Sequence, residues 1–81
     1  MILVDVHALQ LGEVYDFEVD EDKTADELLG DIVTLICKKE NKKQKKEGNY
    51  YLYALNKECV LRGALSFREQ GIRSGERLVL V

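Results

Sequence analysis

The chain has no proline and no tryptophan, and it contains only two cysteines and one histidine. Iron–sulfur clusters of the ferredoxin type need four cysteine ligands, and structural zinc sites need a similar set of Cys and His at short spacings. Cys37 and Cys59 are twenty-two positions apart, so the sequence predicts neither a cofactor nor a metal site. Two cysteines are also too few for a disulfide framework, and we expect them to be buried and reduced.

Long apolar runs and a basic leader are also missing. No apolar stretch reaches the ~18 residues that a membrane span requires, so we expect no membrane insertion. The start, Met-Ile-Leu-Val-Asp, lacks the features of a signal peptide, which favours a cytoplasmic location. The net charge of −3 argues against general binding to nucleic acid. With 81 residues, we expect a single domain over residues 1–81.

Catalysis needs an acid, a base or a nucleophile with a partner, and none is evident. His7 lies on the solvent-facing side of a predicted strand, and no partner for it can be identified. The carboxylates cluster on the polar face of a strand and at a helix start, where solvation and capping explain them. The sequence therefore predicts a protein that is not an enzyme and has no catalytic residues.

Hydrophobic periodicity predicts a hairpin followed by a helix. Apolar and polar residues alternate over residues 2–7 and again over 15–20, and Gly12 between them suits a tight turn. Thr24 and Glu27 have the capping-box spacing, and apolar residues then recur at helical intervals. The pattern predicts an antiparallel hairpin and an amphipathic helix over Ala25–Lys39.

The second half of the chain reads as short strands joined by turns. We expect strands over residues 50–55, 59–61 and 77–81, a turn at Asn56-Lys57 and a helical turn over 65–70. The order β-β-α-β-β-β predicts an α+β fold with one main helix packed across one face of a mixed sheet. The first and last strands can lie parallel in the centre, as in the β-grasp fold.

At this point the sequence resembles a ubiquitin-like β-grasp domain. TADELLGDI has the spacing of the ubiquitin helix, and LYALNK resembles the strand and turn of ubiquitin's recognition patch. The last third resembles the YukD-like family, small ubiquitin-like proteins of type VII (Esx-type) secretion systems in Gram-positive bacteria. The motif that carries this resemblance is NK-x-x-V-x-x-G-x-L-S-x(4)-G-I-x-x-G-E-R-L-x-L-V, residues 56–81.

The resemblance implies a cytoplasmic accessory of type VII secretion that acts by protein–protein interaction, with secretion-system components as partners. Modifiers and sulfur carriers of this fold need a flexible tail ending in Gly-Gly, whereas residues 77–81 read as a strand. We therefore expect a module that is not conjugated. Two alternatives stay open: a scaffolding or regulatory ubiquitin-like domain of an unrelated system, and an RNA-binding β-grasp module. The oligomeric state is not predicted.

Strand parity in a β-grasp sheet predicts one exposed apolar patch. Tyr53 falls where the resemblance puts the central residue of ubiquitin's recognition face, and tyrosine is favoured at binding hot spots. The ordinary alternative is a sheet face with a few harmless apolar side chains. The predicted partner-binding residues are Leu3, Tyr51, Tyr53, Arg77 and Val79.

Positive charge is concentrated between the helix end and a predicted Lys-rich loop over residues 40–49. Three interpretations are open: a solvated surface, docking on an acidic protein, or contact with nucleic acid, which the acidic remainder of the chain disfavours. The candidate electrostatic docking residues are Lys38, Lys39, Lys42, Lys43, Lys45 and Lys46.

Overall fold

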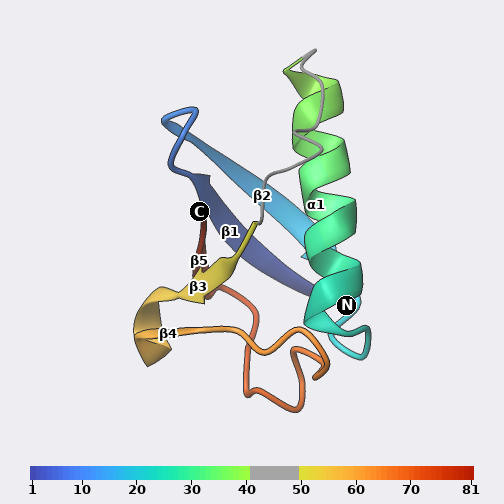
Figure 1. The fold of residues 1–81 in the computed structure, drawn as a ribbon. Helices are drawn as coiled ribbons and strands as arrows, with labels where there is room; N and C mark the ends of the chain where they lie inside the picture. Colours follow the sequence, from blue (N-terminus) through green and yellow to red (C-terminus); the bar gives the residue numbers. More distant parts are fainter. Residues whose placement is uncertain (41–49) are drawn as a thin grey trace.

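The computed structural model describes residues 1–40 and 50–81, and it shows a five-stranded mixed sheet with one helix across one face (Figure 1). The strand order is β2-β1-β5-β3-β4. The predicted Lys-rich loop lies outside the described residues except for Glu40. The elements are β1 (Ile2–Ala8), β2 (Glu13–Val19), α1 (Ala25–Lys39), β3 (Leu52–Ala54), the short 3-10 helix η1 (Leu55–Lys57), β4 (Cys59–Val60) and β5 (Arg77–Leu80).

The predicted hairpin is confirmed. β1 and β2 pair antiparallel, with Val4 opposite Phe17, and the turn contains Gly12 at a φ of 66°. Glycine takes this left-handed conformation without the steric cost that a Cβ atom brings. Alternate residues of β1 are buried, so one face of the hairpin belongs to the core.

Helix α1 has the predicted bounds. The hydroxyl of Thr24 accepts a hydrogen bond from the Glu27 N–H at 3.2 Å, as the capping-box spacing predicts. At the other end, the Glu40 N–H donates to the carbonyl of Ile36 at 2.9 Å. The buried stripe that packs on the sheet consists of Ala25, Leu28, Ile32, Val33 and Ile36.

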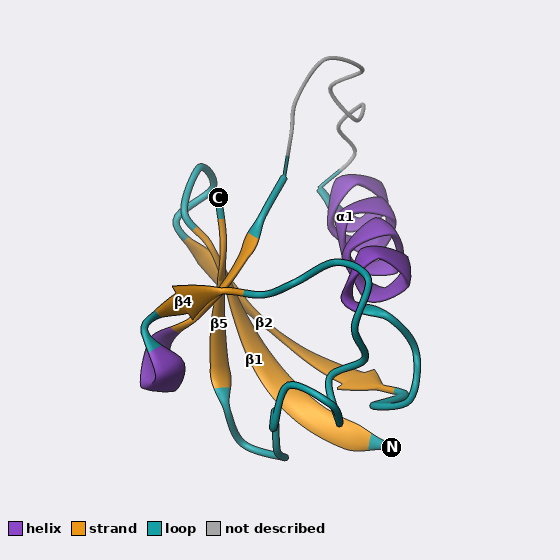
Figure 2. Cartoon of the chain, turned by 60° about the horizontal axis from the view of Figure 1, so that its bottom comes forward, coloured by secondary structure: helices purple, strands orange, loops and turns teal. Residues whose placement is uncertain are grey.

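Strand β5 occupies the centre of the sheet. It runs parallel to β1 and antiparallel to β3, and its residues Leu78 and Leu80 are buried under α1. Figure 2 shows α1 on one side of the sheet, whose strands overlap near the centre of the view. This arrangement is the β-grasp architecture that the sequence predicts.

The connection from β4 to β5 runs past the amino-terminal end of α1 (Figures 1 and 2). The N–H groups of Ala25 and Asp26 donate to the carbonyls of Leu65 and Gly63 at 2.8 and 3.0 Å. These bonds satisfy donors that a helix start leaves without intrahelical partners. Phe67, which is fully buried, anchors the connection to the core.

The predicted helical turn over residues 65–70 is confirmed, because the Gln70 N–H donates to the Ser66 carbonyl at 3.2 Å. Ser66 and Glu69 bond each other's backbone N–H in a capping box, and Gly71 ends the turn with a φ of 73°. The neighbouring strands and turn differ in detail from the sequence prediction. The predicted turn at Asn56-Lys57 is part of η1, and the strands on either side of η1 are shorter than predicted.

The expectation of two buried cysteines is wrong. Cys37 is half-buried on α1, and Cys59 is exposed because it lies in the two-residue edge strand β4; both thiols are free. Within residues 1–40 and 50–81, no helix has the length and hydropathy that a bilayer crossing demands.

A candidate docking surface on the outer face of the sheet

The sheet face turned away from α1 carries a row of side chains that crosses all five strands. Strand pairing sets these residues side by side, and their neighbours along each central strand are buried on the opposite face. Reading from β2 to β4, the row consists of Val14, His7, Val79, Tyr53 and Val60. The two ends are open to solvent, with Val14 55% and Val60 50% exposed. Four of the five side chains are apolar or aromatic, so the row can bury apolar area against a partner.

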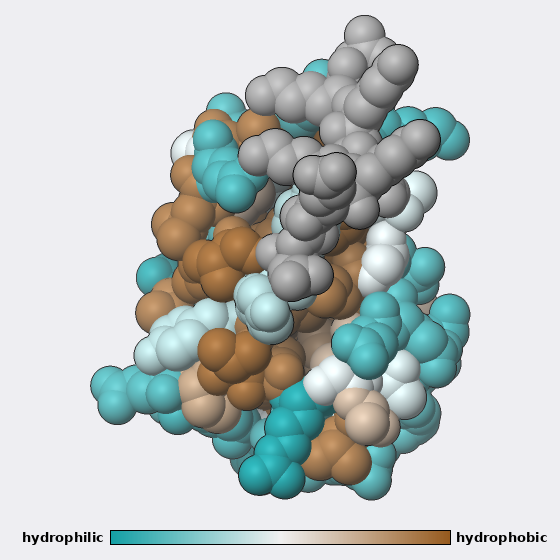
Figure 3. Space-filling model, viewed as in Figure 1, coloured by the Kyte–Doolittle hydropathy of each residue, from teal (hydrophilic) through white to brown (hydrophobic). Residues whose placement is uncertain are grey.

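A second pair extends this surface beside the row. Tyr51 and Val81 exchange two backbone hydrogen bonds, of 2.8 and 3.0 Å, and both side chains are exposed. Tyr51 lies two residues from Tyr53, and Val81 lies two residues from Val79, so both side chains point to the outer face of the sheet. Figure 3 shows hydrophobic residues gathered over the strands on the left of the view, while hydrophilic residues cover α1 on the right. We call Tyr51, Tyr53, Val60, Val79 and Val81 the outer-face patch.

The structure brings together three of the five residues that the sequence singled out: Tyr51, Tyr53 and Val79. Arg77 lies in the adjacent row, opposite Asp5 of β1. Leu3 is 49% exposed but lies beyond that row, opposite Glu18, and is therefore apart from the tyrosines.

Sequence reasoning missed Val60 and Val81. The two-residue strand β4 is too short for alternation to reveal which way Val60 points. Counting back from the turn at Asn56-Lys57 would have paired Val60 with Tyr53, and this was the available signal.

Negative charge borders the row on the β2 side. Asp5 lies opposite Asp16, and the pKa of the Asp16 carboxyl is raised because its protonated form donates a hydrogen bond to Asp5 and because Asp5 carries a like charge. His7 lies between Val14 and Val79, so the strands on either side give it apolar neighbours.

Two of the six candidate docking lysines belong to the described residues. Lys38 and Lys39 end α1, where their charges favour the negative end of the helix dipole. The ammonium of Lys39 lies 5.2 Å from the centre of the Tyr15 ring. Lys42, Lys43, Lys45 and Lys46 lie outside the described residues.

Tyr15 is tied to the same end of the helix. Its hydroxyl donates a hydrogen bond to the Glu40 carboxylate, which raises the pKa of Tyr15 to about 12. Losing the phenol proton would leave two negative groups in contact, so the bond holds the neutral form.

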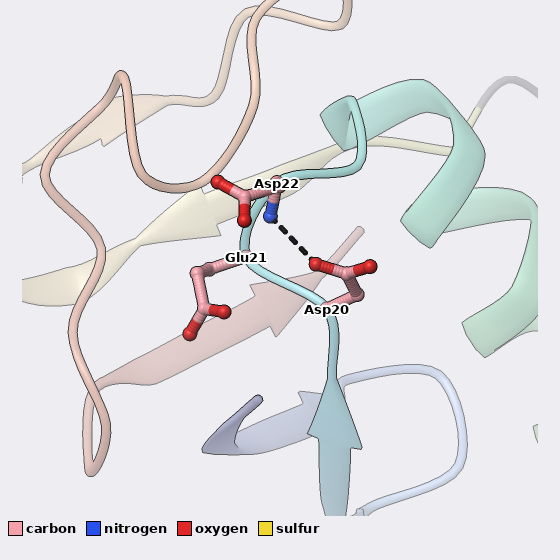
Figure 4. A group of neighbouring side chains, drawn as sticks. All are labelled: Asp20, Glu21 and Asp22. Carbon is pink, nitrogen blue, oxygen red and sulfur yellow. Dashed lines mark hydrogen bonds between the residues drawn. The ribbon is translucent and has the colours of Figure 1, made fainter.

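Three acidic side chains, Asp20, Glu21 and Asp22, come together in the turn between β2 and α1 (Figure 4). The Asp22 N–H donates to the Asp20 carboxylate at 2.9 Å, which stabilises the turn. The Arg68 guanidinium lies 2.6 Å from Asp22 and 3.5 Å from Glu21, and it lowers the pKa of Asp22. The charge of the cluster is thus partly neutralised by a residue of the β4–β5 connection, and we assign the cluster a structural role.

Solved structures of the same fold include a domain of EccD5, a chain of the ESX-5 inner membrane complex and a plant domain. The ubiquitin-like domain of EccD5 from Mycobacterium xenopi is 17% identical, with a TM-score of 0.72 over 99% of this chain and 91% of that chain. A chain of the MycP5-free ESX-5 inner membrane complex is 17% identical, with a TM-score of 0.77 over 99% of this chain. This chain spans only 20% of the length of that ESX-5 chain. A ubiquitin-like domain from Arabidopsis thaliana gives a TM-score of 0.75 at 20% identity, over 99% of this chain and 74% of that chain.

These likenesses establish the ubiquitin-like fold. The comparison with curated proteins gives no match. The family comparison does give one: residues 2–80 match the model described as "WXG100 protein secretion system (Wss), protein YukD". This match covers almost the whole chain, well beyond the last third that carries the sequence motif. The chain therefore belongs to the YukD family, the ubiquitin-like proteins associated with the WXG100 secretion system.

Proposed function

We propose that this protein is a ubiquitin-like module that is not conjugated and that works by binding another protein through the outer-face patch. The observation that carries the proposal is the uninterrupted row from Val79 through Tyr53 to Val60, flanked by the pair Tyr51–Val81. Two tyrosines at the centre of a rigid apolar surface have the composition of a binding hot spot.

The position of β5 supports binding through a surface that the fold holds in place. Residues 77–80 form the central strand, bonded to β1 on one side and to β3 on the other. Releasing them would expose the buried side chains of Leu78 and Leu80.

The partner that we propose is a component of the secretion system, met on the cytoplasmic side of the membrane. Membership of the YukD family supports the link to secretion. A domain of this fold also forms part of a chain in the ESX-5 inner membrane complex, which supports a membrane-bound complex as the place of action. We propose that the protein has no catalytic activity of its own, because the patch offers contact area and no paired acid and base.

The test is capture of the partner by the tagged protein from cells that carry the secretion genes. Tyr53→Ala should abolish capture of secretion-system components while the far-ultraviolet circular dichroism spectrum stays unchanged. The matched control is Leu3→Ala, which removes a similarly apolar side chain, 49% exposed, from a part of the sheet that lies apart from the tyrosines. Equal capture by the wild type and Tyr53→Ala would refute the proposal. Cell fractionation tests the cytoplasmic location.

A further inference from the structure

Strand β2 is an edge of the sheet, and one of its sides has no strand beside it in the described part of the chain. In β1, the Asp5 N–H donates to the carbonyl of Glu76, and the Leu3 carbonyl accepts from the N–H of Gly75. The backbone N–H and C=O groups of the odd-numbered residues of β1 therefore point toward β5. Backbone groups alternate in direction along a strand, so Val4 and Val6 bond β2. By the same alternation, three residues of β2 point their N–H and C=O groups away from β1. These residues are Val14, Asp16 and Glu18.

An apolar groove runs along this edge, between β2 and α1. Phe17 and Leu35 form its middle, and two adjoining hollows share both residues, so the groove is continuous. Toward one end it is lined by Tyr15 and Ile36, with Lys38 and Lys39 of α1 beside them. Toward the other end it is lined by Val19, Leu28 and Ile32, with Asp31 and Thr34 beside them. Leu35 is exposed although it is a large aliphatic residue, which leaves apolar area on the groove wall.

The open edge of β2 and the groove beside it together determine which conformation a bound segment must have. Only an extended backbone can bond a row of N–H and C=O groups spaced along a strand edge. A strand added there lies about 4.8 Å from β2, and its side chains point alternately to the two faces of the sheet. Every second side chain would enter the groove beside Phe17, and the side chains between them would lie on the outer face.

The negative charge of β2 indicates which residues the bound segment should contain. On the outer face, the added strand would lie beside the carboxylates of Asp16 and Glu18. Opposite charges across a strand pair stabilise and like charges destabilise, so the intervening residues should be basic. The contact with Asp5, which raises the pKa of Asp16, is a repulsion that a cation would relieve. The same carboxylates disfavour pairing of β2 with β2 of a second copy, because the two acidic rows would meet.

We propose that β2 and α1 form a strand-acceptor groove for an extended segment of a partner protein in which aliphatic residues alternate with Lys or Arg. This site is separate from the outer-face patch, and it does not depend on the function proposed for that patch. A partner could occupy both, since the patch is centred on β3, β4 and β5 while the groove follows the opposite edge of the sheet.

The experiment titrates the ¹⁵N-labelled full chain with a short capped peptide that alternates valine with lysine. A peptide with glutamate in place of lysine controls for charge, and one with N-methylated edge-facing amides controls for backbone pairing. The alternating lysine peptide should shift the amide signals of Val14, Asp16 and Glu18 most and slow their hydrogen exchange. It should bind at least about tenfold more tightly than either control peptide. Equal binding of the glutamate peptide, or no binding of the lysine peptide, overturns the proposal.

Two variants localise the site. Leu35→Ala should weaken the lysine peptide by about tenfold, and it keeps the fold because the side chain is half exposed. The double variant Asp16→Lys/Glu18→Lys should reverse the preference, so that the glutamate peptide binds better. Shifts centred on Tyr53 and Val79, or protection of β2 that rises with protein concentration in the absence of peptide, would show another site or a self-paired edge and would refute the proposal.

Discussion

Replacing Gly63 with alanine should test why this position of the YukD motif is glycine. The backbone at Gly63 does not have the positive φ that favours glycine, so conformation is not the reason. Space is the reason: a Cβ atom at Gly63 would lie 2.1 Å from an oxygen of the Asp26 carboxylate. The close approach follows from the hydrogen bond of 3.0 Å between the Asp26 N–H and the Gly63 carbonyl, which ties the connection to the start of α1.

The free-energy cost of Gly63→Ala depends on how far the Asp26 side chain has to move. Cβ atoms essentially never lie within 3.0 Å of another atom in this way, so the carboxylate has to move. Leaving a preferred rotamer costs about 0.5–1.5 kcal/mol. Against this, Gly→Ala lowers the entropy of the unfolded chain and stabilises by about 0.4–1 kcal/mol where the alanine fits. The net effect of Gly63→Ala in the wild type should therefore lie between a stabilisation of about 0.5 kcal/mol and a destabilisation of about 1 kcal/mol. In an Asp26→Ala background it should stabilise by about 0.4–1 kcal/mol.

Urea unfolding of the four proteins in this cycle measures both values. The predicted coupling free energy between the two positions is about 0.5–1.5 kcal/mol, with Gly63→Ala more favourable by this amount when the Asp26 carboxylate is absent. A Gly63→Ala effect of the same size with and without the Asp26 carboxylate would refute the reasoning. It would mean that the connection itself, and not the side chain of Asp26, requires glycine.

Three further predictions concern the helix and the two perturbed ionisable groups. Gly30→Ala should raise the free energy of unfolding by up to about 1 kcal/mol in urea, because the added Cβ meets nothing within 4 Å on an exposed helix position. Because the pKa of Tyr15 is raised to about 12, ultraviolet titration should show a late phenol ionisation that Tyr15→Phe removes. The stabilisation that comes from the Tyr15–Glu40 hydrogen bond should be fully present below the ordinary tyrosine pKa near 10, and it should be lost as the pH rises toward 12. Asp16→Asn should stabilise at neutral pH, because the raised pKa of Asp16 means that its charge opposes folding there. Thermal unfolding at acid pH, where the Asp16 carboxyl is protonated, should show little difference from the wild type.

The fold was largely predictable because its main signals are local and agree with one another. Thr24 and Glu27 marked the helix start, and alternation over residues 2–7 and 15–20 marked the hairpin. The helical turn over residues 65–70 was predictable for the same reason. Ser66 and Glu69 have the capping-box spacing and bond each other's backbone N–H, and Gly71 ends the turn in the left-handed conformation.

Only part of the candidate surface could be predicted from the alternation of residues along each strand. Alternation shows which face of the sheet a side chain is on, but the register between strands decides which side chains are neighbours. Leu3 and Tyr53 share the outer face, yet the row of Asp5 and Arg77 separates them. The groove beside β2 could not be found from periodicity, because it arises where Phe17 of one element meets Leu35 of another.

The two proposed sites differ in how much conformational entropy is lost when a partner binds. The centre of the outer-face patch, Tyr53 and Val79, belongs to strands held on both sides, since β5 lies between β1 and β3 and β3 lies between β5 and β4. Its tyrosines are therefore positioned before a partner arrives, and little conformational entropy is lost when they are buried. The groove instead gains its last strand from the partner, which must give up the freedom of an extended segment. Measured with separate partners, the patch should therefore bind more tightly per unit of buried area, whereas the groove should discriminate more sharply by sequence, through the alternation that the edge and the carboxylates of Asp16 and Glu18 impose.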